Sequence, residues 1–224
     1  ETHFAVGDTV YGMGMNGFSE YCLANTDLIA KGDEQLSFDT LASLPVVALT
    51  VEHAFYRLMQ IKKDMNVLIH AGAGGVGQVA TQYALNAGCL VWVTCSDGKR
   101  SRIDDRVSGI GNSRDAEDFN TQITDVQFDV VLNCLSERYI DYSLDRLKPE
   151  GHFIEIGKRG IWTTEQVANY RPDVQYSTVA IDHKIANEPK YIAELLRSIM
   201  QRNLKPIGET TYDFDKAIDA FWFL

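Results

Sequence analysis

The sequence is poor in basic residues. Lys and Arg number 21 against 31 Asp and Glu, so the 224-residue chain carries a formal net charge of −10. It contains neither a basic run nor an alternation of basic and aromatic residues, so we expect no nucleic-acid partner. No apolar stretch approaches the length of a membrane span, and the first residues lack a signal-peptide pattern. We therefore expect no membrane partner.

Cysteine is also scarce, and its spacing argues against two kinds of site. The four cysteines, Cys22, Cys89, Cys95 and Cys134, form no C-x-x-C pair. They are expected to be reduced core residues and not a disulfide framework or a zinc site. This predicts a cytoplasmic protein without a bound metal. Hydrophobic residues make up 45% of the chain, which is enough for a substantial core.

The most informative segment is Met65–Gly77, a short apolar strand that leads directly into a glycine loop. Gly72, Gly74 and Gly77 fit G-x-G-x-x-G, and Gln78–Asn86 can form the helix that follows. In this pattern one glycine permits a tight turn, one lets the backbone approach a pyrophosphate, and one lets the helix pack on the strand. The helix N-terminus adds N–H groups for phosphate. The pattern predicts a dinucleotide site, and a glycine-rich turn without a ligand is the alternative.

The rest of the chain divides into a β-rich beginning and a longer alternating segment. The expected early elements are strands Ala5–Tyr11, Gly17–Ala24 and Leu28–Lys31, then helices from Ser37 and over Val46–Met59. Later strands are expected at Asn66–His70, Leu90–Cys95, Asp129–Asn133, His152–Ile156 and Val174–Ile181, and later helices at Gln78–Asn86, Ile140–Leu147, Pro189–Arg202 and Asp215–Phe223. Alternation of this kind predicts an α/β fold with a doubly wound parallel sheet.

Several runs outside the glycine loop resemble known families. Gly7–Gly12, Gly17–Tyr21 and Ala42–Thr50 resemble the medium-chain dehydrogenase/reductase superfamily. Three other runs are similar to the enoyl reductase domains of polyketide and fatty acid synthases, namely Asn112–Asp115 (Asn-Ser-Arg-Asp), Asp129–Ser136 and Gly151–Lys158 (ending Glu-Ile-Gly-Lys). The resemblance covers nearly the whole chain, which lacks the cysteine-rich lobe of zinc-dependent alcohol dehydrogenases.

The resemblance implies a zinc-free reductase that combines a Rossmann domain with a GroES-like substrate domain. We place part of the β-rich substrate domain at residues 1–40, the dinucleotide-binding domain at 41–205 and a return segment at 206–224. The family pattern begins earlier and continues further, so we expect a fragment or a sequence with segments left out. The stretch between Gly98 and Asn112 is short for the family, and its helix is expected to be poorly formed.

Cofactor choice depends on the end of the strand Leu90–Cys95. NAD enzymes place an acid there for the ribose hydroxyls, whereas Ser96 and Lys99 suit the 2′-phosphate of NADPH. Asp97 lies close enough to act as that acid, which keeps NAD as the alternative. The sequence therefore favours NADPH, while an ordinary solvated helix start is the alternative role for Lys99.

Further cofactor contacts are expected along the same edge of the sheet. Gly74, Gly75, Val76 and Gly77 would present N–H groups to the pyrophosphate. The resemblance implies additional contacts from Thr50, Ser113 and Arg114. The strand ends at Asn133, Cys134, Leu135 and Gly157 should pass near the nicotinamide, although packing is the alternative for Cys134 and Leu135.

Lys158 and Asp182 are the candidate catalytic residues. Each follows a strand of the expected sheet, at the carboxyl edge where open α/β sheets bind ligands. A lysine and an aspartate that meet there can stabilise negative charge and deliver a proton, and the resemblance implies this proton-donating role. A surface ion pair of small energetic effect is the alternative.

The resemblance thus implies NADPH-dependent reduction of an α,β-unsaturated acyl thioester carried on an acyl carrier protein, with neighbouring synthase domains as partners. Three alternatives share the glycine loop. They are a stand-alone quinone or enone reductase, a cyclopropane-forming relative that expels halide, and a cofactor-binding domain without catalysis. The Glu-Ile-Gly-Lys and Asn-Ser-Arg-Asp runs weigh against the first.

Overall fold

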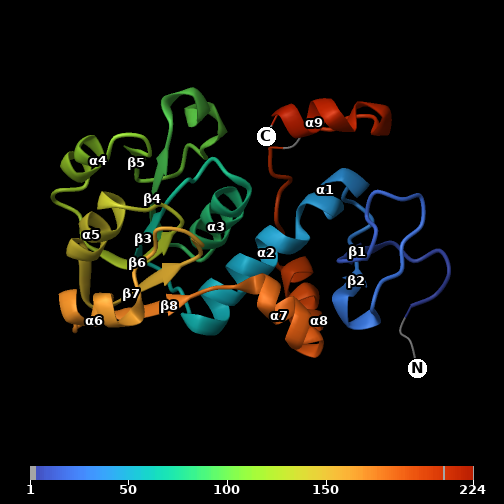
Figure 1. The fold of residues 1–224 in the computed structure, drawn as a ribbon, viewed down its shortest axis with the longest axis horizontal. Helices are drawn as coiled ribbons and strands as arrows, with labels where there is room; N and C mark the ends of the chain where they lie inside the picture. Colours follow the sequence, from blue (N-terminus) through green and yellow to red (C-terminus); the bar gives the residue numbers. More distant parts are fainter. Residues whose placement is uncertain (1–3, 209, 224) are drawn as a thin grey trace.

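Six parallel strands form the centre of the protein, which a computed structural model describes over residues 4–208 and 210–223. The strands are β3 (Asn66–Ile69), β4 (Leu90–Cys95), β5 (Gly109–Asn112), β6 (Phe128–Asn133), β7 (Leu147–Glu155) and β8 (Gln175–Thr178). Their order is β5-β4-β3-β6-β7-β8, so the winding reverses between β3 and β6 (Figure 1). A crevice for a ligand opens at such a reversal, outside the carboxyl ends of the strands. The predicted doubly wound α/β fold is confirmed.

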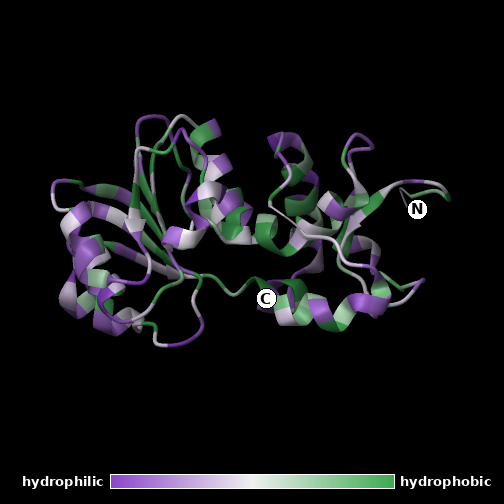
Figure 2. Ribbon diagram, turned by 90° about the horizontal axis from the view of Figure 1, so that it is seen from above, coloured by the Kyte–Doolittle hydropathy of each residue, from purple (hydrophilic) through white to green (hydrophobic). Residues whose placement is uncertain are grey.

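Alternate residues of the central strands point to opposite faces of the sheet and belong to two separate apolar cores. Val67 and Ile69 of β3 belong to one core, whereas Leu68 between them belongs to the other. This alternation is the expected consequence of the two-residue period of a strand. Helices cover both faces, and Figure 2 shows the apolar strands between more polar helices.

The first core lies under one set of helices and the second core under another. The first set is α2 (Pro45–Glu52), η2 (His53–Leu58), α3 (Gly75–Asn86), α7 (Ile181–Asn187) and α8 (Pro189–Ile199), with the short η4 (Met200–Arg202) after α8. The second set is α4 (Ala116–Gln122), α5 (Arg138–Asp145) and α6 (Thr164–Tyr170).

A small β-rich lobe packs against α8. It contains the antiparallel pair β1 (Val10–Gly12) and β2 (Ile29–Lys31), with η1 (Thr26–Leu28) and α1 (Phe38–Ser43). The buried Tyr11 hydroxyl donates a hydrogen bond to the Leu196 carbonyl of α8 at 2.5 Å. Just after the helix, Arg202 of η4 forms an ion pair at 2.7 Å with Glu52 of α2, a carboxylate that is 1% exposed. The α8 region therefore connects the lobe to the sheet domain.

The last described segment returns towards the lobe through η5 (Phe214–Lys216) and α9 (Ala217–Phe223). The Thr211 hydroxyl donates to Asp39 of α1 at 3.2 Å, and the Phe18 and Phe221 rings lie 6.0 Å apart. Trp222 of α9 is 86% exposed. Within the described residues, no helix has the length and apolar character needed to cross a membrane.

The structure corrects several predicted elements. The predicted strand over Gly17–Ala24 is wrong, because this segment is mostly turns and makes only an isolated bridge between Met15 and Leu23. The predicted strand Val174–Ile181 is too long, since β8 ends at Thr178 and α7 begins at Ile181. The edge strand β5 and the helices α4, α6 and α7 were not predicted. The poorly formed helix expected after Gly98 is confirmed as the 3₁₀ segment η3 (Asp97–Arg102).

Candidate functional site

The glycine loop after β3 packs more tightly than its sequence pattern requires. A Cβ added at Gly72 would lie 2.7 Å from Cβ of Val93, and one at Gly77 would lie 2.3 Å from the Ala71 carbonyl oxygen. These two glycines therefore permit contact with β4 and between α3 and the loop. The tight turn itself is made by Ala71, whose φ is 51°, and not by a glycine of the pattern.

Three backbone N–H groups at the start of α3 are available to a phosphate. Gly74 is the N-cap residue, and its carbonyl accepts from the Gln78 amide at 2.8 Å. Gly75, Val76 and Gly77 precede Gln78, so their amides belong to the first turn, which has no acceptor within the helix. The positive end of the helix dipole lies at the same place. This geometry fits a pyrophosphate beside Gly74, which is exposed.

The residues predicted to select the cofactor meet at the carboxyl ends of β4 and β5. Cys95 and Asn112 pair in register, and the Ser113 amide donates to the Cys95 carbonyl at 3.0 Å. Ser96, the N-cap residue of η3, and Lys99 within η3 are therefore brought to the same edge as Ser113 and Arg114. Lys99 and Arg114 are exposed there.

Asp97, the residue that could bind the ribose hydroxyls of NAD, forms an ion pair with Arg100. Arg100 Nε donates to Asp97 Oδ1 at 3.1 Å. This pair turns the carboxylate towards its own helical turn, and Lys99 lies between the two residues in the sequence. The Asp97 carboxylate therefore already accepts a hydrogen bond from within the chain.

A second group of predicted residues lies at the ends of β6 and β7. Asn133 is fully buried, and its amide nitrogen donates to Glu155 Oε2 at 2.6 Å and to the Leu135 carbonyl at 2.8 Å. Glu155 Oε1 accepts from the Gly157 amide at 2.6 Å. Glu155 was missed as a site residue, although an acid inside the apolar run His152–Ile156 was a visible signal.

Thr50 and Cys134 are less available than their sequence positions suggested. The Thr50 hydroxyl donates to the Val46 carbonyl at 2.8 Å within α2, and the side chain is 6% exposed. Burial, with the nearby Glu155 charge, raises the pKa of Cys134 to about 11, so its thiol is neutral at physiological pH. Cys134 lies beside the His70 carbonyl and serves packing more than chemistry.

Lys158 and Asp182 form the predicted pair. Lys158 Nζ donates to Asp182 Oδ2 at 2.6 Å, and the two side chains are 68% and 64% exposed. The hydrogen bond from Lys158 lowers the pKa of Asp182 below its usual value, so the carboxylate is charged at neutral pH. Lys158 follows β7 as predicted, whereas Asp182 lies in the first turn of α7.

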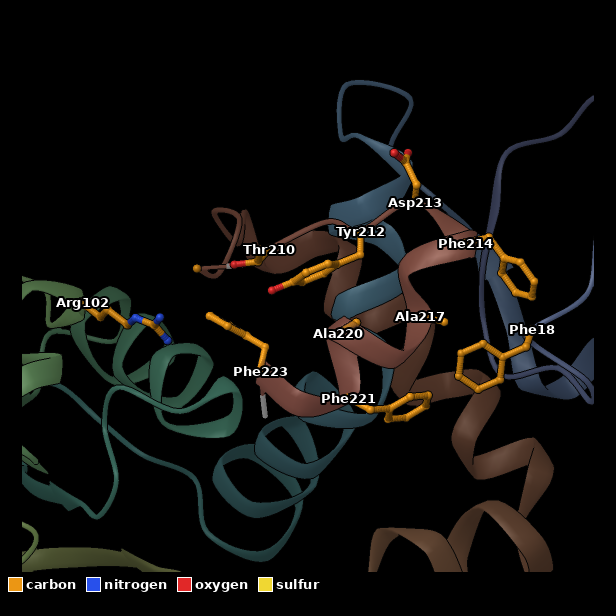
Figure 3. Close-up of a pocket in the computed structure, with 11 residues that line it drawn as sticks. Phe18, Arg102, Thr210, Tyr212, Asp213, Phe214, Ala217, Ala220, Phe221 and Phe223 are labelled. Atoms are coloured by element: carbon orange, nitrogen blue, oxygen red, sulfur yellow. The ribbon is translucent and has the colours of Figure 1, made fainter.

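A cavity of about 690 Å³ lies away from these residues (Figure 3). Figure 3 shows Arg102 of η3 on one side and Tyr212, Phe221 and Phe223 on the other. None of the residues predicted for the cofactor or for catalysis lines it. The predicted site is the open carboxyl edge of the sheet and not this cavity.

Comparison with known proteins identifies the family. A zinc-binding dehydrogenase family model matches residues 105–224. The structure of the CurK enoyl reductase superposes with a TM-score of 0.86 at 32% identity, covering 100% of this chain and 70% of that one. The chain belongs to the polyketide synthase enoyl reductases of the medium-chain dehydrogenase/reductase superfamily.

Two further similar proteins differ in how much longer they are than this chain. The pikromycin polyketide synthase component PikAII of Streptomyces venezuelae is 34% identical over 98% of this chain, which spans only 6% of that protein. The CurF ER cyclopropanase from the curacin A biosynthetic pathway superposes with a TM-score of 0.83 at 29% identity, over 89% of this chain and 62% of that one.

The name of the matching family refers to zinc, but the residues that the structure describes do not form a zinc site. Over residues 4–208 and 210–223, no group of three or more His, Cys, Asp or Glu side chains is placed to hold a metal ion. Cys89 and Cys95 are buried as single thiols. We therefore derive no chemical step from a metal.

Proposed function

We propose that this enoyl reductase reduces the α,β double bond of an acyl thioester with NADPH. The observation that carries the proposal is the Lys158–Asp182 pair, with 2.6 Å between Nζ and Oδ2, on the sheet edge that also holds the glycine loop. When bound, NADPH supplies the hydride that adds to the β-carbon of the substrate. The remaining task for the protein is to bind the reactants and to manage charge and one proton.

The protein would hold the cofactor in three places along the edge. The amides of Gly75, Val76 and Gly77 would bind the pyrophosphate, as expected for a helix N-terminus. The residues beyond β4 and β5 would bind the 2′-phosphate, namely Ser96, Lys99, Ser113 and Arg114. The residues beyond β6 and β7 would line the nicotinamide half, namely Asn133, Cys134, Leu135 and Gly157.

Lys158 would act on the substrate as electrostatic partner and acid. Reduction at the β-carbon leaves negative charge on the thioester oxygen, and an exposed ammonium can stabilise this charge and donate a proton to the α-carbon. Asp182 would hold the ammonium in place and favour its return to the protonated state. Both side chains are accessible enough to meet a substrate that enters from solvent.

The substrate would arrive on an acyl carrier protein, and the neighbouring domains of a synthase would be the other partners. Support comes from relatives such as PikAII, in which the matching segment is a small part of a polyketide synthase. We place the reaction in the cytoplasm, where the four single cysteines stay reduced.

Cyclopropane formation is a second candidate. The similarity to the CurF ER cyclopropanase favours it, since 89% of this chain is covered. The same cofactor site would serve, but a halogenated substrate would close a ring and lose halide instead of gaining a proton. Lys158 would then be dispensable for the last step, which separates the two functions.

The test is to mix the protein with NADPH and a simple enoyl-pantetheine thioester. Loss of nicotinamide absorbance that depends on both reactants supports reduction. NADPH binding without turnover on any enoyl thioester would indicate a cofactor-binding domain without catalysis. Turnover of quinones but not of thioesters would indicate a quinone reductase.

A further inference from the structure

A buried carboxylate without a cationic partner lies beneath the proposed nicotinamide site. Glu155, the last residue of β7, is 1% exposed, and no Lys or Arg in the described part of the chain forms an ion pair with it. Burial raises the pKa of Glu155, which shows that the charged form is costly here. A residue of this kind must be held by hydrogen bonds.

Those hydrogen bonds come from the last residue of β6 and from the loop after β7. Asn133 donates to one carboxylate oxygen at 2.6 Å, and the Gly157 amide donates to the other at 2.6 Å. Asn133 also fixes the next turn, because it donates to the Leu135 carbonyl at 2.8 Å and accepts from the Leu135 amide at 3.1 Å. One carboxylate thus ties the loop after β6 to the loop after β7.

The same contact explains why position 157 is a glycine. A Cβ at this position would lie 2.7 Å from Glu155 Oε1, so no other residue fits without moving the carboxylate. Lys158 follows immediately and turns out to solvent. The residues of the Glu-Ile-Gly-Lys run therefore act together. Glu155 fixes the Gly157 amide by a hydrogen bond, and the position of Gly157 determines where the backbone of Lys158 lies.

The position of Glu155 and Asn133 along the sheet indicates which half of the cofactor would lie over them. The glycine loop follows β3, and the proposed phosphate-selecting residues follow β4 and β5 on one side of it. A dinucleotide that crosses the reversal between β3 and β6 must place its other half over β6 and β7. Asn133 and Glu155 are the last register pair of those strands.

We propose that Glu155 is a positioning residue, which acts through Asn133 and Gly157 to fix the loops that hold the nicotinamide half of the cofactor. The inference rests on the proposed function for its ligand. It predicts that loss of the Glu155 charge disturbs one half of the cofactor site and leaves the adenosine half intact.

The test variant is Glu155→Gln, which places an amide where the carboxylate accepts two bonds. If the oxygen of the introduced amide accepts from Gly157, the introduced NH₂ faces the NH₂ of Asn133, and two donors meet. The double variant Asn133→Asp with Glu155→Gln reverses this bond, because the new carboxylate accepts from the new amide. It keeps the acceptor for the Leu135 amide, but its second carboxylate oxygen faces the Leu135 carbonyl, so it should restore the loop after β7 and not the turn after β6.

The matched control is Asp129→Asn at the opposite end of β6. This carboxylate also ties strands together, since it accepts from the Asn66 amide of β3 at 2.7 Å, and, unlike Glu155, it has a cationic partner in Lys148 of β7 at 2.8 Å. It lies at the amino edge of the sheet, away from the proposed cofactor site. A general loss of sheet stability should therefore appear in both variants, whereas a positioning effect should appear only in Glu155→Gln.

Two measurements decide the proposal. Amide hydrogen exchange over residues 134–137 and 156–160 should be faster in Glu155→Gln, and in the double variant it should return towards normal over residues 156–160. NADPH affinity should fall about ten- to a hundredfold, the size of loss expected when a buried hydrogen-bond donor is left unsatisfied. Affinity for 2′,5′-ADP, which carries only the phosphate-bearing half, should stay within about twofold of the unmodified protein.

Equal losses for NADPH and 2′,5′-ADP, unchanged exchange in both loops, or no recovery in the double variant would each overturn the positioning role. An Asp129→Asn variant with the same selective loss would also overturn it. If the unmodified protein binds neither ligand, the proposed function fails, and the hydrogen-exchange comparison still decides whether Glu155 fixes the two loops.

Discussion

Lys158 Nζ lies 2.6 Å from Asp182 Oδ2 and joins the loop after β7 to the first turn of α7. The contact is mostly exposed, so it contributes little to stability, as is usual for surface ion pairs. Its position at the carboxyl edge of the sheet is the reason to assign it a chemical role.

Loss of either member of the pair should reduce turnover and leave NADPH binding intact. We expect Lys158→Ala and Asp182→Ala each to lower kcat by about 10²–10⁴-fold, the usual contribution of a general acid. The double variant should be little worse than either single one, because one substitution already breaks the unit.

The matched control for the pair is Lys184→Ala, which breaks a surface contact of 3.1 Å with Glu188 at the end of α7. Steady-state kinetics and an NADPH titration on all four variants separate chemistry from binding. Losses below about tenfold, or full activity of the double variant, would remove Lys158 and Asp182 from the mechanism and leave water as the proton source.

Lys99 should select NADPH over NADH. Removal of a charged hydrogen bond to the 2′-phosphate in Lys99→Ala should weaken NADPH binding by about 1.5–3 kcal/mol and leave NADH nearly unchanged. Arg106→Ala is the matched control, because Arg106 is an exposed cation that pairs with Asp104 at 2.7 Å and has no role assigned in cofactor binding. Equal losses for both cofactors in the Lys99 variant would refute this assignment. Preference of the unmodified protein for NADH would make Asp97 the ribose acid.

The glycines of the loop should respond differently to substitution. Gly74→Val places its side chain near little except the Ala71 carbonyl at 3.3 Å, so it should block the phosphate and leave the melting temperature almost unchanged. Gly77→Val forces a Cβ to within 2.3 Å of that carbonyl, and it should cost about 3 kcal/mol or more of folding stability.

Thermal unfolding and NADPH fluorescence titration, with Gly98→Ala as a control in open space, distinguish the two effects. A stable Gly77→Val protein would contradict the packing role of this glycine. Normal NADPH binding by Gly74→Val would contradict the assignment of the loop to the pyrophosphate.

His70 should make the protein less stable in acid. It is fully enclosed beside Ser143 Oγ at 2.8 Å and Thr94 Oγ1 at 3.2 Å, and burial lowers its pKa from 6.5 to about 3. Between these values the unfolded chain binds a proton that the folded chain excludes. The free energy of unfolding should therefore fall with falling pH, by about 1.4 kcal/mol per pH unit for this group.

Denaturant unfolding at several pH values checks the slope. The slope of the unfolding free energy against pH should decrease in His70→Gln by the amount that corresponds to about one bound proton. Substitution of the exposed His183 by Gln should leave the slope unchanged. Identical slopes for His70→Gln and the unmodified protein would show that other groups, such as His53 with a pKa lowered to about 4, dominate the acid response.

The sequence predicted best where local pattern and sheet position agree. The strand before Gly72 is apolar and continuous, so β3 and α3 were assigned correctly. The edge strand β5 was missed because Gly109 and Gly111 leave its four residues without an apolar pattern. The segment Gly17–Ala24 alternates in the sequence, yet it is largely exposed and forms turns in place of a ladder.

In the candidate site, too, contacts that depend on strand pairing were harder to predict than those that follow from the local sequence. Lys158 and Asp182 were paired from their places at the sheet edge, and the contact exists. Glu155 was overlooked because Asn133, its partner from another strand, becomes a neighbour only when β6 and β7 align. Ala71 took the left-handed turn that the pattern assigns to a glycine, which depends on its bond to Thr94 Oγ1 at 3.0 Å.

The most direct test of the central claim is the mass of an acyl group on its carrier protein. An α,β-unsaturated acyl carrier protein should gain two hydrogens for each NADPH consumed when the protein is added, and deuterium from labelled NADPH should appear at the β-carbon. An unchanged acyl mass while NADPH is oxidised, or loss of halide with ring closure from a halogenated substrate and no reduction of the plain one, would contradict enoyl reduction as the function.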